Sequence, residues 1–141
     1  MGGGYIQCDD FCGDDKSGSA MSGVLEELPS QLPESERDTF VSELIAPLQR
    51  QLDETGEYFL IPSASSKRLL PIVDLLYDNY RQRFGDADVW NAIELDDESG
   101  LDPIEAKWGK GAGWRYYCLT DLRVALQRSI DSDSDVCVSF D

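Results

Sequence analysis

Histidine is absent from this chain of 141 residues, and that absence removes several kinds of chemistry at once. Ser-His-Asp and Cys-His nucleophiles, imidazole acids and bases, and His-ligated zinc all require it. Basic side chains are also scarce, because 12 lysines and arginines stand against 28 acidic residues and leave a net charge of −16. Such a charge disfavours direct binding to nucleic acid or to an anionic membrane, and it makes a cationic partner the natural complement.

Long apolar runs and a secretory leader are missing as well. No apolar stretch approaches the roughly 20 residues that span a bilayer, and the opening MGGGYIQCDD has neither the basic nor the apolar region of a signal peptide. We therefore expect a soluble protein in the reducing cytosol, whose cysteines are reduced structural thiols. The cysteines are Cys8, Cys12, Cys118 and Cys137. Together they could in principle bind zinc, but there is no Cys-x-x-Cys pair, and no metal site is predicted.

The sequence does contain enough apolar material, 41% of its residues, for one compact domain covering residues 1–141. Two segments repeat apolar residues at intervals of three and four, the pattern of amphipathic helices. The first, residues 35–54, contains Pro47, which should kink or divide the helix, and ends at Gly56. The second, residues 66–84, ends at Gly85. Their apolar stripes are Phe40, Val41, Leu44, Ile45, Leu48 and Leu52, and Leu69, Ile72, Val73, Leu76, Tyr80 and Phe84.

Strands are predicted where short apolar and aromatic runs occur, at residues 5–8, 57–61, 114–118 and 136–140. Residues 9–22, rich in Asp, Gly and Ser, are expected to form a loop. Thr120 can cap a helix that extends to Ile130, so the last third of the chain predicts a β-α-β unit. A helix of this length allows either a parallel crossover or an antiparallel return. We expect an α+β fold, with a small mixed sheet of three to five strands packed with three to four helices.

The densest acidic segment is the predicted partner-binding site, since residues 86–105 carry eight acidic residues and no lysine or arginine. Asp86 can cap a short helix, and an irregular stretch follows from Asp96 to Gly113. Carboxylates at this density repel one another, and a cationic partner would relieve that repulsion. The segment also contains tryptophan, which is enriched at binding hot spots. The predicted contact residues are Asp86, Asp88, Trp90, Glu94, Asp96, Asp97, Glu98, Asp102, Glu105 and Trp108.

A solvated loop that only aids solubility is the alternative for this segment, and either tryptophan could equally belong to the core. The next candidate contact is the acidic loop from Asp9 to Asp15. Residues 131–135 alternate Asp and Ser like the start of a calcium loop, but Val136 replaces the glycine required at the sixth position, which favours a polar turn. Gly-rich residues 109–113 match no phosphate-binding motif and also favour a turn. No catalytic residue and no cofactor is predicted.

The opening MGGGYIQCDDF and the closing segments GWRYYCLTDLRVAL and VCVSFD belong to a short, very acidic, His-free chain. In these features the chain resembles the immunity proteins of bacterial polymorphic toxin and contact-dependent growth inhibition systems. The resemblance implies a cytosolic protein without enzymatic activity, which binds the toxic C-terminal domain of a cognate effector and blocks its active site or substrate groove. Such toxins are often basic nucleases, which agrees with the charge argument.

Two other classes of function stay open. An acidic nucleic-acid mimic would present carboxylates in place of phosphates to a DNA-binding effector, and it would compete generically with DNA, whereas an immunity protein binds one toxin tightly. A small enzyme is disfavoured by the missing histidine and by the lack of a cofactor motif. The neighbouring genes would distinguish an immunity protein from a nucleic-acid mimic. An adjacent reading frame for a toxin would favour an immunity protein, whereas a position among phage genes would favour a mimic.

Overall fold

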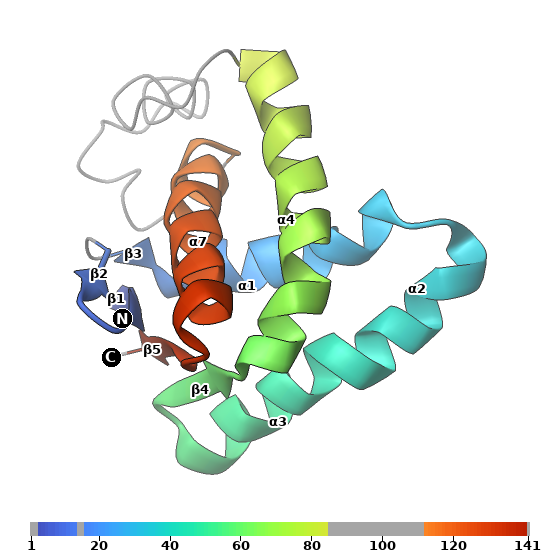
Figure 1. Cartoon of the computed structure of the whole chain (residues 1–141). Helices are drawn as coiled ribbons and strands as arrows, with labels where there is room; N and C mark the ends of the chain where they lie inside the picture. The colour runs from blue at the N-terminus through green and yellow to red at the C-terminus, as the bar shows by residue number, and fades with distance from the viewer. Residues whose placement is uncertain (1–2, 14–15, 85–111, 141) are drawn as a thin grey trace.

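A computed structural model describes residues 3–13, 16–84 and 112–140 of the chain. Two long helices, α4 (Ser63–Phe84) and α7 (Ala112–Ser132), lie side by side and run in opposite directions, next to a small sheet (Figure 1). The other helical segments are α1 (Gly18–Glu27), the 3-10 turn η1 (Leu28–Gln31), α2 (Glu34–Phe40), the π-helical turn η2 (Val41–Ile45) and α3 (Ala46–Thr55). The strands are β1 (Gly3–Cys8), β2 (Phe11–Cys12), β3 (Lys16–Ser17), β4 (Tyr58–Ile61) and β5 (Val136–Phe140).

Every ladder between the described strands is antiparallel. The strand order is β2-β1-β5-β4, and β3 pairs with the first residues of β1. The central ladder joins the two ends of the chain, since β1 pairs with β5 and Ile6 lies opposite Val138. On the other side of β5, Phe59 of β4 also lies opposite Val138. The predicted α+β class with a small sheet is confirmed, but among the described strands the sheet is antiparallel rather than mixed, and no parallel crossover is formed.

In the part of the chain that the structure describes, one apolar core lies between the sheet and the helices. Alternate strand residues face it, as the pleat of a strand requires, and Ile6, Phe59 and Val138 are only 1–2% exposed. Leu76 of α4 and Leu126 of α7 are buried to a similar degree. Removing each such side chain from water contributes about 1.5–3 kcal/mol, so this core is the main source of stability for the fold.

Side chains of α3 cover the outer edge of β4. The Gln51 amide nitrogen donates to the carbonyl oxygen of Leu60 (3.1 Å), and Gln51 Oε1 accepts from the Leu60 N–H (2.9 Å). Thr55 repeats this arrangement at Tyr58, where its hydroxyl donates to the carbonyl oxygen (2.8 Å) and accepts from the N–H (3.0 Å). These two side chains take the place of a neighbouring strand, and they block the pairing of this edge with another chain.

The first long helix is divided near Pro47, as its sequence predicts. Helix α2 passes through the π-helical turn η2 before α3 begins, and Pro47 lies in the first turn of α3, where a missing N–H is tolerated. The helix ends at Gly56, which has a φ of 71° and donates its N–H to the Leu52 carbonyl at 2.7 Å. Helix α4 begins at Ser63, slightly before the predicted start, and contains Pro71.

Residues 114–118 are helical rather than extended, so the predicted β-α-β unit is wrong. Aromatic side chains favour strands, and this run of Trp, Tyr and Cys follows that local preference. The buried residues of α7, however, recur at the helical period of three and four, at Tyr116, Leu119, Leu122 and Leu126. Packing of this continuous stripe outweighs the local preference for a strand.

Residues 9–22, predicted to be a loop, contain β2, β3 and the beginning of α1. The hairpin between β1 and β2 is closed by the Gly13 N–H, which donates to the Ile6 carbonyl at 2.9 Å. Helix α1 is absent from the sequence-based prediction, although its buried residues Met21, Val24 and Leu25 have helical spacing, which continues to Leu28 at the start of η1. The surrounding Gly and Ser residues obscured this signal because they are typical of turns.

A polar cluster joins α1, α4 and α7. The Tyr80 hydroxyl donates to Glu27 Oε1 (2.6 Å) and accepts from Arg115 Nε (2.9 Å), while Arg115 also pairs with Glu27 at 2.8 Å. Burial, followed by the hydrogen bond to Glu27, raises the pKa of Tyr80. The Tyr80 ring also packs edge-on against Tyr116. A Cβ at Gly23 would lie 3.1 Å from the Arg115 side chain, so glycine leaves room for this cluster.

Candidate partner-binding site

The predicted contact residues, from Asp86 to Trp108, all lie outside the described residues, and so does the short helix predicted to begin at Asp86. The structure places the two helices that border them in sequence, α4 before and α7 after. Residues 131–135 form the end of α7 and the turn into β5, in agreement with the predicted polar turn. The next candidate, the acidic loop that begins at Asp9, is described in part.

Two turns that are far apart in sequence meet at one end of the sheet and bring five carboxylates together. The turn between β1 and β2 carries Asp9 and Asp10, and the segment from α7 to β5 carries Asp131, Asp133 and Asp135. All five side chains are exposed. The β1–β5 ladder causes the meeting, because its register, continued beyond the last pair, places Asp9 opposite Asp135. We call these five residues the acidic corner.

An arginine of α7 forms an ion pair with one carboxylate of the acidic corner. Arg128 Nη1 lies 2.7 Å from Asp10 Oδ1, although the two residues are 118 positions apart. Asp9 has a φ of 54°, a left-handed conformation that aspartate tolerates better than most residues. Hydrogen bonding to Ser132, and then to Ser134, lowers the pKa of the Asp9 carboxyl. The Asp9 carboxylate is therefore ionised well below neutral pH.

Asp131 lies where a helix disfavours negative charge. It is in the last turn of α7, and the unpaired carbonyl groups there give the helix a partial negative charge. A carboxylate at such a position costs about 0.3–1 kcal/mol, and this turn contains no basic residue. The Gln127 amide donates to Asp131 Oδ1 at 3.0 Å, a neutral contact that leaves the charge in place. A side chain whose charge opposes the preference of its helix terminus is often found at a functional site.

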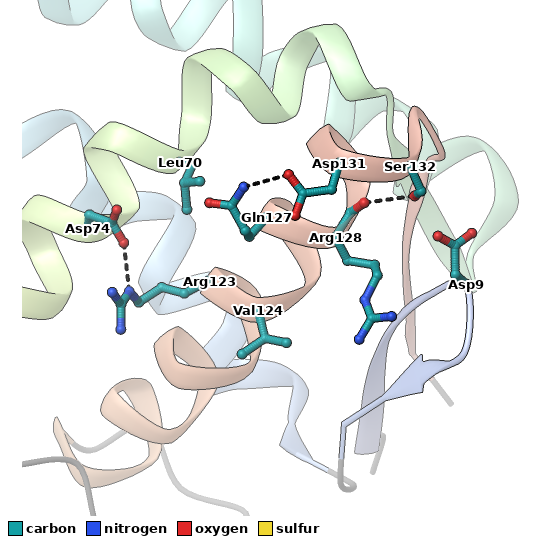
Figure 2. A pocket seen from close by; sticks show the side chains of 9 residues that line it. All are labelled: Asp9, Leu70, Asp74, Arg123, Val124, Gln127, Arg128, Asp131 and Ser132. Atoms are coloured by element: carbon teal, nitrogen blue, oxygen red, sulfur yellow. Dashed lines mark hydrogen bonds and ion pairs between the residues drawn. The ribbon is translucent and has the colours of Figure 1, made fainter.

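A groove extends from the acidic corner along α7 and α4 (Figure 2). Its volume is about 660 Å³, and it is open to solvent. Helix α4 forms one wall, α7 forms the base, and the β1–β2 turn closes one end. The lining residues are Asp9, Leu70, Asp74, Arg123, Val124, Gln127, Arg128, Asp131 and Ser132.

The end of the groove away from the acidic corner is fixed by a second arginine. Arg123 Nε lies 2.6 Å from Asp74 Oδ1, which links α7 to α4. The Arg123 guanidinium also lies 4.0 Å from the centroid of the Tyr77 ring, in a cation–π contact. Both side chains of the ion pair are about 40% exposed, so the pair orients the groove wall more than it stabilises the fold.

The four cysteines are free thiols, with Cys8 and Cys118 buried, Cys12 exposed and Cys137 partly buried. Burial raises the pKa of Cys8 and of Cys137. Across residues 3–13, 16–84 and 112–140, no three potential metal ligands are grouped so that they could hold an ion. None of the helices in these ranges is long and apolar enough to cross a bilayer.

No protein-family model, curated protein or solved structure matches this chain. The sequence contains both halves of the acidic corner, as an acidic loop at Asp9 and a polar turn at Asp131. Only the pairing of β1 with β5 shows that they form one surface.

Proposed function

We propose that this chain binds and neutralises a cationic protein, the toxic domain of a cognate effector. The observation that carries the proposal is the acidic corner, where two distant turns bring five exposed carboxylates to one end of the sheet and one of them, Asp10, pairs with Arg128. Gathering like charges destabilises a fold, and a partner of opposite charge relieves the repulsion. The choice of a toxin as the partner comes from the resemblance to immunity proteins.

Electrostatic attraction explains how such a protein would act on a basic nuclease. The positive groove that guides nucleic acid into the nuclease would attract an acidic protein by the same field, at rates approaching roughly 10⁸ M⁻¹s⁻¹ at low salt. Once bound, the acidic protein excludes the substrate by covering or occupying that groove. Inhibition by capture needs no catalytic group and no cofactor.

A second acidic surface adds to the long-range field. Between α2 and β4 the chain carries seven exposed carboxylates against two arginines. None of these seven residues lines the groove between α4 and α7, and Glu43 pairs with Arg68 of α4 at 3.0 Å. The carboxylates there are Glu34, Glu36, Asp38, Glu43, Asp53, Glu54 and Glu57.

We also propose that the segment from Asp86 to Trp108 contacts the toxic domain, as its sequence predicts. Reversing Asp96, Asp97 and Glu98 to lysine should weaken protection in cells and speed dissociation of the toxin, while the thermal melt changes little. If the triple variant neutralises the toxin with equal affinity at low salt, the segment only aids solubility.

Co-expression with the product of the neighbouring reading frame tests the function directly. We expect growth arrest by that product, relief of the arrest by this chain, and a purified complex that weakens as salt is raised. An unrelated basic DNA-binding protein serves as the control and should not be captured. Capture of both proteins, with competition by DNA, would indicate a nucleic-acid mimic. A chain that neither rescues growth nor forms a complex would refute the proposal.

A further inference from the structure

The groove between α4 and α7 has apolar side chains within a charged rim. Leu70 of α4 and Val124 of α7 line it, and Val124 is 44% exposed. A single exposed valine is ordinary on a protein surface. Here, however, it lies between an ion pair at one end of a groove and the acidic corner at the other (Figure 2). An apolar centre with a polar rim is the usual anatomy of a protein interface.

The charges of the rim favour a cation over an anion. Both arginines of the groove, Arg123 and Arg128, have carboxylate partners at 2.6 and 2.7 Å. Asp9 and Asp131 take no part in these two ion pairs; the neutral Gln127 amide donates to Asp131 Oδ1 at 3.0 Å, and hydrogen bonding to serine lowers the pKa of Asp9. An incoming lysine or arginine therefore meets carboxylates whose hydrogen-bond donors are neutral. An incoming phosphate would have to break an existing ion pair and approach the acidic corner.

We propose that this groove binds a basic segment of the partner protein in which an apolar side chain lies between lysines or arginines. The apolar side chain packs on Leu70 and Val124, and the cations bind at Asp9 and Asp131. This inference rests on the proposed function, because it names the place where the cationic partner docks. Nucleic acid does not fit, since the acidic corner repels its phosphates.

Three substitutions remove charge from the corner without changing its shape, namely Asp9→Asn, Asp131→Asn and Asp133→Asn. Asparagine keeps the hydrogen-bonding oxygen and tolerates the φ of 54° found at Asp9 and Asp133. Neutralising Asp131 also removes an anion from the C-terminal end of α7. Neutralising Asp9 has the opposite effect, because its lowered pKa means that the ionised carboxylate stabilises the fold at neutral pH. We therefore expect the two effects to offset each other and the triple variant to melt close to the wild-type temperature, and a melt of each variant separates a loss of binding from a loss of folding.

A second triple variant is the matched control. It combines Glu34→Gln, Glu36→Gln and Asp38→Asn, which change the net charge by the same amount at exposed positions on α2. The probe is a short fluorescent peptide in which lysines alternate with leucines, and its binding is followed by anisotropy at low salt. We expect the corner variant to bind about 10-fold more weakly than wild type, because it loses contacts as well as charge. The control loses only its share of the long-range field and should bind within about 2-fold of wild type.

Val124→Ser tests the apolar centre, because serine and valine have similar helix propensities. We expect about 3-fold weaker binding of the lysine–leucine peptide and no change for an all-lysine peptide. If the substitution weakens the binding of both peptides equally, Val124 does not contact an apolar side chain of the peptide. If the two triple variants lose binding equally, the groove is not the docking site, and the proposed function is unaffected. If the wild-type chain captures the product of the neighbouring reading frame but binds no peptide, the groove is not the docking site and the proposed function still stands. If it captures neither, both the groove as docking site and the proposed function are refuted.

Discussion

Replacing Tyr80 by phenylalanine isolates the polar cluster that joins α1, α4 and α7. The substitution removes one hydroxyl and keeps the buried ring, which is only 1% exposed and packs against Tyr116. Two hydrogen bonds are lost, one donated to Glu27 (2.6 Å) and one accepted from Arg115 (2.9 Å). Neither charged group is left alone, because Glu27 and Arg115 still pair at 2.8 Å.

The expected loss of stability is therefore moderate. A hydrogen bond to a charged group contributes about 1.5–3 kcal/mol when its partner would otherwise be orphaned. Here Glu27 and Arg115 retain each other, and their side chains are 31% and 28% exposed, so water can replace part of what is lost. We expect Tyr80→Phe to lower the free energy of unfolding by about 1–2 kcal/mol at pH 7.

The pH dependence of this loss has a definite sign. The folded protein raises the pKa of Tyr80 above its unfolded value of about 10, so the stabilisation is complete below pH 10 and is lost as the pH rises further. As the pH rises above 10, the free energy of unfolding of the wild type should therefore fall by up to about 1.4 kcal/mol per pH unit more than that of the variant. The gap between the two proteins should narrow above pH 10.

Urea unfolding followed by circular dichroism at pH 7 and at several values above pH 10 measures both effects. The control is Tyr58→Phe, the same chemical change at a side chain that is 39% exposed, and it should stay within about 0.5 kcal/mol of wild type. Equal midpoints for Tyr80→Phe and wild type at pH 7, or a gap that stays constant at alkaline pH, would refute the reasoning.

Gln51→Ala uncovers the outer edge of β4 and should cause concentration-dependent self-association in sedimentation experiments, whereas Gln49→Ala, at an exposed position of the same helix, should not. Leu126→Ala should lower the free energy of unfolding by about 2–5 kcal/mol in urea, because the side chain is fully buried, and a loss below about 1 kcal/mol would contradict this. Exposed Cys12 should react with a maleimide before Cys8, which is buried and whose pKa is raised by burial, and mass spectrometry of partly labelled protein reports the order.

The long helices could be predicted because their signals are local. The stripe from Phe40 to Leu52 recurs with the helical period, and Gly56 provides the left-handed residue that ends it. Pro47 predicts a break without specifying its form, which is a π-helical turn. The strand at residues 136–140 is similarly marked by a short run of apolar residues between polar ones.

The acidic corner could not be predicted, because it depends on contacts between distant residues. Local patterns identify a turn at Asp9 and another at Asp131, but no local pattern states that β1 pairs with β5. The error at residues 114–118 contributed, since a strand there would have been a competing partner for β5. A one-residue change in register would also have turned the side chains of β1 to the opposite face of the sheet.

The residue type at the acidic corner separates it from the other acidic surface of the protein. All five corner carboxylates are aspartates, whereas five of the seven on the outer helices are glutamates. Turn conformation explains aspartate at Asp9 and Asp133, both with a φ of 54°, but it does not explain Asp131, which the helix dipole disfavours. A short side chain on a turn fixed by the β1–β5 ladder loses less conformational entropy when a cation binds than a long glutamate on an exposed helix does. Under the proposed function, the aspartates of the corner are therefore better suited to direct contact with the partner, while the glutamates add to the field that attracts it.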